Sequence, residues 1–246
     1  MAKLRGRRII ISGASSGIGL ETARRVVAEG GEVCLVARRS APLEAAAREI
    51  GDHAWAWPCD VADPESVSAL AGEAKRRWGA VDGLVNNAGI APMARLDETK
   101  DDVWEDTFAV NVRGPFLLCR ELGDMLHEGS SPSVVNISST LAARAIPGMA
   151  AYNTSKAALN QMTRSLALEW APTVRVNAIM PAVVDTPIHA SRGMTSEQVQ
   201  EMAAFHPLGR VGQPEDVAAM IVFLLSDDSS WMTGTVIPVD GGVMAG

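Results

Sequence analysis

Residues 8–19, RIIISGASSGIG, decide the fold of this 246-residue chain. A run of isoleucines ends at Ser12, a glycine-rich turn follows, and a helical pattern continues to Glu29. Such a turn between a first strand and a helix lets the backbone approach a pyrophosphate, whose charge the helix N-terminus stabilises. Glycine spacing alone also fits an ordinary tight turn, but its place at the first strand favours a dinucleotide site. The turn residues expected to contact the dinucleotide are Gly13, Ser15, Ser16, Gly17, Ile18 and Gly19.

Beyond this turn, apolar runs of strand length alternate with longer helical patterns, which requires crossovers and hence a parallel sheet. The expected strands lie near residues 8–12, 32–37, 53–57, 81–86, 133–138, 174–179 and 235–239. The expected helices lie near 17–29, 41–50, 64–78, 100–127, 151–170 and 214–225. We therefore predict one doubly wound α/β domain of the Rossmann type over residues 1–246. Residues 186–212 exceed an ordinary connection, hold a short helical pattern near 196–204, and are predicted to form a substrate lid.

The composition excludes several classes of protein. With 47% hydrophobic residues and a formal net charge of -7, the chain can form a sizeable core and gives no reason to expect nucleic-acid binding. Cys34, Cys59 and Cys119 lack metal-ligand spacing, as do the scattered histidines, so we expect no metal site and a reducing compartment. The apolar run near the start ends at Ser12 and is too short for a signal-peptide core, and the longest apolar run, Val217–Leu225, is too short for a membrane span. We expect a soluble, cytoplasmic protein.

The end of the second strand indicates which dinucleotide is bound. A carboxylate about twenty residues after the glycine turn typically accepts a hydrogen bond from the ribose 2′-hydroxyl of NAD. This chain has Arg38 and Arg39 there instead, and two guanidinium groups can bind a 2′-phosphate. The alternative is a solvated arginine pair that opens the next helix. We predict that NADP(H) is preferred, with NAD(H) possible.

Polar residues also end the third and fourth strands. The carboxylate of Asp60 can accept a hydrogen bond from an adenine amine, whereas Asp63, before Pro64, is better placed to cap the next helix. The amides of Asn86 and Asn87 can either join neighbouring strands or touch the cofactor, and their positions leave both readings open. The cofactor contacts expected at these strand ends are Asp60, Val61, Asn87, Ala88 and Gly89.

Tyr152 and Lys156 lie four residues apart and would share one face of a helix. A phenol and an ammonium at roughly 4 Å, with an effective dielectric of about 20, interact by on the order of 4 kcal/mol, or about three pKa units. A tyrosine with a normal pKa near ~10 would then act as an acid or base near neutrality. The spacing alone equally describes a surface pair, so this interpretation needs a cofactor site and a third group.

Several further motifs supply that support, and together they resemble the short-chain dehydrogenase/reductase family from Arg8 to Gly242. The matching pieces, in order, are Gly13 to Gly19, Asp60-Val61, Asn86-Asn87-Ala88-Gly89, Asn111-Val112-Arg113-Gly114, Asn136-Ile137-Ser138-Ser139, Tyr152-Asn153-Thr154-Ser155-Lys156 and Val239-Asp240-Gly241-Gly242. Each piece is weak alone, but their order along the chain is that of the family.

The resemblance implies a catalytic tetrad of Asn111, Ser139, Tyr152 and Lys156. In reduction, Tyr152 would protonate the substrate carbonyl that receives hydride from the nicotinamide, and Ser139 would position the same oxygen. Lys156 would bind the nicotinamide ribose and lower the pKa of Tyr152. Asn111 would hold a water that links Lys156 to solvent; its alternative is a polar residue inside a long helix. Ser138, beside Ser139, is expected to be structural.

The resemblance also implies that residues 181–186 hold the nicotinamide carboxamide, with contacts from Pro181, Val184 and Thr186. Ala182 stands where the family usually has glycine, so a positive φ there would be strained. By the same analogy the substrate wall contains Pro92, Met93, Leu141, Ile146, Met149, Val183, Ile188, His189 and Phe205. This largely apolar wall favours a neutral or hydrophobic ketone or secondary alcohol. Three arginines near the wall, Arg95, Arg144 and Arg192, could bind a carboxylate, but we expect them to face solvent.

Two other functions are compatible with these motifs, and two of the helices predict an oligomer. A 3-oxoacyl-[acyl-carrier-protein] reductase performs the same chemistry, but its acidic carrier would require a basic patch that an acidic chain does not suggest. A non-catalytic dinucleotide-binding regulator would use the same fold without needing a complete tetrad. The helices near 100–127 and 151–170 carry apolar residues on more than one face, including Phe116 and Leu122, and the family pairs these helices between subunits. We predict a homotetramer; burial within one subunit is the alternative.

Overall fold

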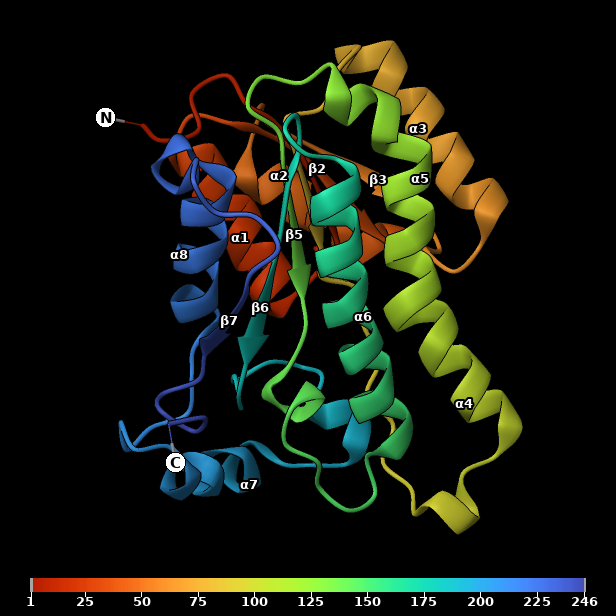
Figure 1. Ribbon diagram of the computed structural model, residues 1–246, viewed down its shortest axis with the longest axis vertical. Helices are drawn as coiled ribbons and strands as arrows, with labels where there is room; N and C mark the ends of the chain where they lie inside the picture. Colours follow the sequence, from red (N-terminus) through yellow and green to blue (C-terminus); the bar gives the residue numbers. More distant parts are fainter. Residues whose placement is uncertain (1, 246) are drawn as a thin grey trace.

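The computed structural model describes residues 2–245 and contains one seven-stranded sheet in which every neighbouring pair of strands is parallel (Figure 1). The strands are β1 Arg8–Ser12, β2 Glu32–Ala37, β3 Ala54–Pro58, β4 Gly83–Asn86, β5 Ser133–Ile137, β6 Arg175–Pro181 and β7 Val236–Val239. Their order across the sheet is β3-β2-β1-β4-β5-β6-β7, so the direction of winding reverses between β1 and β4. The doubly wound fold predicted from the sequence is confirmed, and the strand bounds differ from expectation by only one or two residues.

Helices cover both faces of this sheet (Figure 1). The helices are α1 Gly17–Ala28, α2 Ser40–Ile50, α3 Pro64–Trp78, α4 Asp101–Phe108, α5 Gly114–His127, α6 Ala150–Glu169, α7 Ser196–Glu201 and α8 Pro214–Leu225. The first, second and eighth helices pack on one face, and the third, fifth and sixth pack on the other. No helix within residues 2–245 has the length and apolarity needed to cross a membrane.

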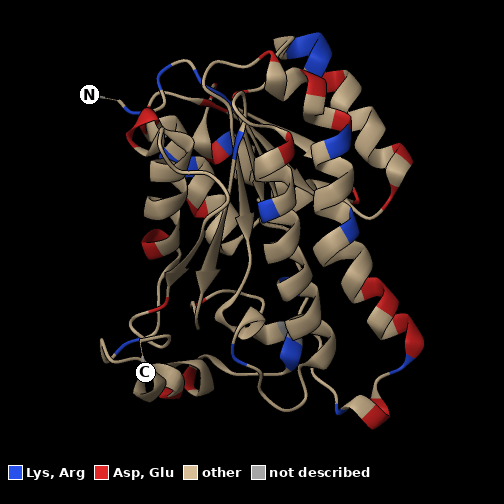
Figure 2. Cartoon of the chain, viewed as in Figure 1, with Lys and Arg blue, Asp and Glu red and all other residues tan. Residues whose placement is uncertain are grey.

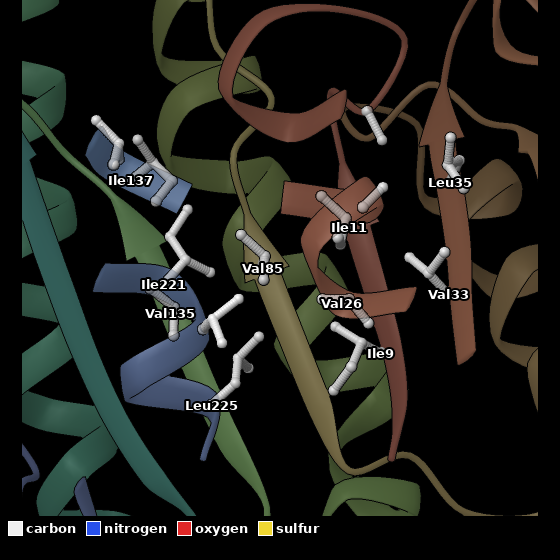
Figure 3. Close-up of a cluster of buried hydrophobic side chains, with 14 of the residues drawn as sticks. Ile9, Ile11, Val26, Val33, Leu35, Val85, Val135, Ile137, Ile221 and Leu225 are labelled. Atoms are coloured by element: carbon white, nitrogen blue, oxygen red, sulfur yellow. The ribbon is translucent and has the colours of Figure 1, made fainter. Parts of the chain in front are cut away.

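The central strand β1 is buried on both faces, as expected for a parallel sheet. Ile9 and Ile11 enter one hydrophobic core, whereas Ile10 enters the other, because successive side chains of a strand point to opposite faces. Figure 3 shows Ile9 and Ile11 beside Val26 of α1 and Val33 of β2. Each fully buried isoleucine contributes about 1.5–3 kcal/mol relative to an exposed one. This burial fixes the strand and therefore the position of the glycine turn that follows it.

The expected helix over 100–127 is interrupted, which corrects the sequence prediction. Between α4 and α5 the chain makes a π-helical turn over Ala109–Arg113. Pro115 has no backbone N–H to donate to the carbonyl of Asn111, so the regular helical bond cannot form there. A Cβ on Gly114 would lie 2.9 Å from Cγ2 of Val61, so this part of the helix is held close to the strand ends. The wider turn carries the fully buried Asn111.

The segment expected to form a lid, residues 186–212, lies across the carboxyl ends of the strands (Figure 1). It contains a 3₁₀ turn over Ala190–Arg192, the short helix α7 and a second 3₁₀ turn over Met202–Phe205. The helix expected near 196–204 is therefore shorter, with a 3₁₀ end. A capping box stabilises its start, in which the side chain of Thr195 accepts from the N–H of Gln198 and the Gln198 side chain accepts in return.

Candidate active site

A cavity of about 790 Å³ lies at the carboxyl ends of the strands and brings most of the predicted site residues together. Its wall includes Gly13, Ser15, Ser16, Gly17, Ile18, Arg38, Arg39, Val61, Asn87, Ala88, Gly89, Ser139, Tyr152, Lys156, Pro181, Val184 and Thr186. Three predicted residues are not part of this wall, namely Gly19, Asp60 and Asn111. The cavity extends from the glycine turn to the segment 186–212, as expected for a ligand at a topological switch point.

The side chain of Asn87 explains why the first and last residues of the turn, Gly13 and Gly19, are glycines. Its side-chain Nδ2 donates to the carbonyls of Ser12 and Gly13, at 3.0 and 3.1 Å. A Cβ would lie 2.8 Å from this nitrogen at Gly13, which also has a φ of +67°, and 2.5 Å at Gly19. Side chains at these positions would therefore push Asn87 away from the turn. Gly19 serves this packing and does not reach the cavity wall.

The N-terminus of α1 has backbone donors available to an anion. Ser16, the residue before the helix, has an extended conformation, and its side chain makes no capping hydrogen bond to the first helical turn. The first amide groups of a helix have no partner within the helix, so an uncapped start presents them to the cavity. This arrangement fits the pyrophosphate of a dinucleotide.

Arg38 and Arg39 follow β2 and lie in the cavity wall with exposed side chains. Neither forms an ion pair with any carboxylate of the described part of the chain. Their guanidinium groups are therefore open to an external anion such as a ribose 2′-phosphate.

The polar residues at the third and fourth strand ends form hydrogen bonds within the protein. Oδ1 of Asp60 accepts from the N–H of Ala62 at 3.0 Å, and Asp63 caps α3 as predicted. Nδ2 of Asn86 donates to Oδ1 of Asn136 at 2.8 Å, joining β4 to β5. The reading in which these amides join neighbouring strands is thus correct for Asn86, while Asn87 both joins strands and lines the cavity.

Tyr152 and Lys156 are both buried, with 7% and 4% of their surfaces exposed, which excludes the surface-pair reading. They lie on α6, and the Nζ of Lys156 lies 5.7 Å from the centre of the Tyr152 ring. This nitrogen donates to the carbonyl of Ile137 at 2.8 Å. Burial lowers the pKa of Lys156 to about 8, because the charged form loses hydration. The ammonium therefore titrates close to physiological pH.

The pKa of Tyr152 is raised above its ordinary value, so the expectation that Lys156 lowers it is wrong for this structure. Burial is the largest cause, and the hydrogen bond with Ser139 and the charge of Arg192 oppose it. The Lys156 ammonium is held by a backbone carbonyl and does not offset that burial. Tyr152 thus keeps its proton near neutrality, which suits a proton donor.

Asn111 links the strand ends to α6 through three hydrogen bonds. Its Oδ1 accepts from the N–H of Ile90, and its Nδ2 donates to the carbonyl of Ile90 and to Oγ of Ser155, at 2.9 to 3.0 Å. A Cβ on Gly89 would lie 3.3 Å from Oδ1 of Asn111 and 3.4 Å from Nζ of Lys156. The glycine therefore lets the chain pass between these two side chains.

The two neighbouring serines have different surroundings. The hydroxyl of Ser138 donates to the carbonyl of Lys156 at 3.2 Å and so joins β5 to α6. The hydroxyl of Ser139 accepts from the N–H of Leu141 at 3.1 Å and also reaches the phenol of Tyr152. This contact singles out Ser139 as the serine beside the phenol.

Residues 181–186 pass the cavity without backbone strain. Among the described residues other than glycine, only Ser131 has a positive φ, so Ala182 replaces glycine at no conformational cost. The backbone strain that a positive φ at Ala182 would cause is therefore absent. Oγ1 of Thr186 donates to the carbonyl of Val184 at 3.3 Å, and a Cβ on Gly17 would lie 3.1 Å from Cγ2 of Thr186. This stretch therefore lies against the glycine turn.

The substrate side of the cavity contains most of the predicted wall residues, but Arg192 points inward instead of facing solvent. Of the expected wall, the cavity includes Leu141, Ile146, Val183, Ile188, His189 and Phe205 but not Pro92, Met93 or Met149. Met149 is instead buried against Tyr152, and the side chain of Met93 is exposed. Arg192 was expected to face solvent, but its guanidinium lies over the Tyr152 ring, with 5.5 Å from Cζ to the ring centre.

The other two arginines near the wall differ from each other in their surroundings. Arg95 is exposed and paired with Asp97, as expected. Arg144 lines the cavity and donates to the carbonyl of Val243 near the C-terminus. The wall further includes His206, which sequence reasoning missed because no motif surrounds it. No group of three histidine, cysteine, aspartate or glutamate residues between positions 2 and 245 is arranged to hold a metal ion.

Comparison with known proteins identifies the family. Residues 13–244 match the sequence model of a family described as enoyl-(acyl carrier protein) reductase. The chain is 39% identical to galactitol 2-dehydrogenase (L-tagatose-forming) of Cereibacter sphaeroides, over 98% of this chain and 96% of that protein. It is 37% identical to cis-4-hydroxycyclohexanecarboxylate dehydrogenase of Sinomonas cyclohexanicum, over 97% of each chain.

A solved structure agrees with these relatives. The structure of 3-ketoacyl-(acyl-carrier-protein) reductase from Brucella melitensis, complexed with NADH, superposes with a TM-score of 0.92 at 34% identity, covering 98% of this chain and 99% of that one. The fold, the cavity and the sequence relatives therefore agree. The chain belongs to the short-chain dehydrogenase/reductase family, whose members are nicotinamide-dependent oxidoreductases acting on alcohols and ketones.

Proposed function

We propose that this protein is an NADP(H)-dependent carbonyl reductase, or alcohol dehydrogenase working in the reverse direction, with Tyr152 as the general acid and base. The observation that carries the proposal is a buried Tyr152 beside Ser139, in the same cavity as an uncapped helix start and two arginines that form no ion pair among the described residues. The dinucleotide, when bound, supplies the hydride.

Each residue of the tetrad has a separate task in this proposal. Ser139 hydrogen-bonds the substrate oxygen and holds it at the phenol. Tyr152 donates its proton to that oxygen in reduction and takes it back in oxidation. Lys156 binds the ribose hydroxyls next to the nicotinamide through its ammonium group. Asn111 holds the chain around Gly89. The proton would be replenished through a water beside Asn111, as the family resemblance implies.

Most of the remaining predicted residues would bind the cofactor. The turn Gly13–Gly19 and the start of α1 receive the pyrophosphate. Arg38 and Arg39 would receive the 2′-phosphate, and Val61 would lie near the adenine. Asp60 lies outside the cavity wall and supports this side of the site through its hydrogen bond with the N–H of Ala62. Asn87, Ala88 and Gly89 line the cavity and would contact the ribose and nicotinamide, and Pro181, Val184 and Thr186 would hold the carboxamide. The buried, unpaired thiols Cys34, Cys59 and Cys119 support action in the reducing cytoplasm.

The arginine pair leads to a prediction about cofactor choice. The double variant Arg38→Gln/Arg39→Gln should lower the ratio of kcat/KM for NADPH to that for NADH by about 10- to 100-fold, because charge-assisted bonds to the phosphate are lost. Steady-state kinetics with both cofactors measure this ratio. Arg48→Gln, an exposed arginine of α2, serves as the control and should leave the ratio unchanged. A wild-type enzyme that uses NADH as efficiently as NADPH would contradict the assignment.

The part of the cavity wall that lies beyond the catalytic tetrad favours a substrate whose main body is apolar. Leu141, Ile146 and Phe205 face the cavity and offer no hydrogen bonds from their side chains. The relatives named above are named for a polyol and for a hydroxycyclohexanecarboxylate, so the body of the substrate differs among similar chains. We propose a ketone or secondary alcohol of low polarity, with residues 186–212 closing over it as a lid.

A 3-oxoacyl-[acyl-carrier-protein] reductase is the second candidate, and the Brucella neighbour favours it. Against it, α4 and the turn before it carry exposed carboxylates, seen in red at the lower right of Figure 2. They lie at the same end of the molecule as the strand ends (Figure 1) and would repel an acidic carrier. Comparing acetoacetyl thioesters with simple ketones as substrates separates the two activities.

The assembly proposed from the sequence is a homotetramer. Phe116 of α5 and Trp104 of α4 are 46% and 36% exposed, so these helices present aromatic surface to solvent in a single chain. Sedimentation equilibrium should give a mass about four times that of the 26.0 kDa chain. A mass equal to one chain at micromolar concentration would refute this assembly.

A ketone panel assayed with NADPH tests the proposed activity. We expect nicotinamide oxidation with at least one ketone and its loss in Tyr152→Phe. If NADPH binds but no ketone, thioester or alcohol reacts, the alternative of a non-catalytic dinucleotide-binding regulator replaces this proposal.

A further inference from the structure

Arg192 is fixed in the part of the cavity that a substrate must enter. It ends the 3₁₀ turn Ala190–Arg192, and its Nε donates to the carbonyl of Ala91 at 2.9 Å. Its guanidinium carbon lies 5.5 Å from the centre of the Tyr152 ring. The side chain is half-buried and lines the cavity together with Leu141 and Phe205. A permanent positive charge therefore lies next to the phenol.

This charge lacks the partners that other buried arginines of the chain possess. The guanidinium of Arg175 donates to Leu224, Ser226 and Ser229, and Arg7 pairs with Asp227. Arg192 has no carboxylate within ion-pair distance among residues 2–245, and its two terminal nitrogens donate to no described acceptor.

Leaving such a cation half-buried and unpaired costs free energy, which an external anion would offset. The neighbouring His189 does not supply a second positive charge. Burial is the largest cause that lowers the pKa of His189, and the charge of Arg192 lowers it further. The imidazole is therefore neutral at pH 7, and Arg192 provides the fixed charge on the lid side of the cavity.

We infer that the terminal nitrogens of Arg192 bind a carboxylate carried by the substrate, which is an oxo acid or hydroxy acid with an apolar body. The inference rests on the proposed function and adds a carboxylate at one end of the otherwise apolar substrate proposed there. A guanidinium offers two parallel N–H donors, which match the two oxygens of a carboxylate. The apolar wall would hold the body while Arg192 and Ser139 fix its two polar ends, which sets the distance between carboxylate and carbonyl.

A matched pair of substrates tests this inference: 4-oxocyclohexanecarboxylate and its methyl ester, each reduced with NADPH. The wild-type enzyme should prefer the acid. Arg192→Gln should lower the ratio of kcat/KM for the acid to that for the ester by about 10- to 100-fold, because a charge-assisted bidentate pair is lost. Arg192→Lys keeps the positive charge but lacks the two parallel N–H donors of a guanidinium, so it should retain part of the preference for the acid. Arg95→Gln, an exposed arginine paired with Asp97, is the matched control and should leave the ratio unchanged.

Several outcomes would overturn the inference. A wild-type preference for the ester, or a ratio that Arg192→Gln does not change, contradicts it. A rise in the Kd for NADPH in Arg192→Gln, without a change in the ratio, would assign Arg192 to the cofactor. If neither compound is reduced, calorimetric titration of both into the enzyme–NADP⁺ complex gives the same comparison, and equal affinities contradict the inference. Failure of the proposed reductase function gives a different result from failure of this inference, because the enzyme then reduces no neutral ketone either.

Discussion

Replacing Tyr152 by phenylalanine should lower kcat by about 100- to 10,000-fold in both directions, the range typical of removing a general acid or base. The phenol is buried at 7% exposure, and burial raises its pKa, so the wild-type residue carries the proton that the carbonyl oxygen must receive. Phenylalanine keeps the ring contacts with Met149 and Ala91 and removes only the hydroxyl. Steady-state rates of NADPH oxidation with an active ketone measure the effect.

Two controls separate catalysis from folding in this variant. NADPH affinity, followed by nicotinamide fluorescence, and the thermal midpoint should change little. Tyr152 is the only tyrosine of the chain, so tyrosinate absorbance in the wild type reports its titration directly. We expect that titration to begin above the ordinary tyrosine range in the absence of cofactor. A variant that retains more than about one tenth of the wild-type kcat would remove Tyr152 from the acid/base role.

Replacing Lys156 by methionine should lower kcat/KM by about 10- to 100-fold, because the charge-assisted bond to the ribose is lost. Methionine fills a similar volume without a charge, so the buried position is not left empty. Lys75→Met, on the exposed side of α3, is the matched control. An unchanged NADPH affinity together with an unchanged kcat would contradict the role of Lys156.

The pH dependence of cofactor binding follows from the same residue. Burial lowers the pKa of Lys156 to about 8, so the ammonium that donates to the ribose loses its proton as the pH rises through that value. The Kd for NADPH should therefore be constant below this pH and rise above it in the wild type. The rise should be absent in Lys156→Met, because methionine does not titrate.

The sequence predicted the sheet because its strands are nearly continuous apolar runs, which is what burial on both faces demands. β1, with Ile9 to Ile11 in two cores, is the clearest case. The π turn over Ala109–Arg113 was missed because apolar residues continue on both sides of Pro115 and hide the lost hydrogen bond. A hydrophobic pattern reports which residues are buried and does not report the hydrogen-bond register inside a helix.

The positions of the candidate site residues followed from topology. In a parallel sheet the strand ends meet at one edge, so motifs at the ends of β1, β4 and β5 had to converge there. Two features did not follow. The raised pKa of Tyr152 depends on burial, which belongs to the packed molecule. The inward direction of Arg192 depends on its bond to the carbonyl of Ala91, 101 residues earlier in the chain. No local signal in residues 186–212 encodes that contact.

The central claim is hydride transfer from a nicotinamide to a carbonyl at Tyr152, and isotope transfer measures it most directly. The enzyme is incubated with NADPH dideuterated at C4 of the nicotinamide and with a ketone that it reduces, and the product alcohol is analysed by mass spectrometry. The proposed mechanism predicts one deuterium on the carbinol carbon, formed by the wild type and not by Tyr152→Phe. Alcohol without deuterium, or bound NADPH that yields no alcohol from any ketone or thioester, would contradict it.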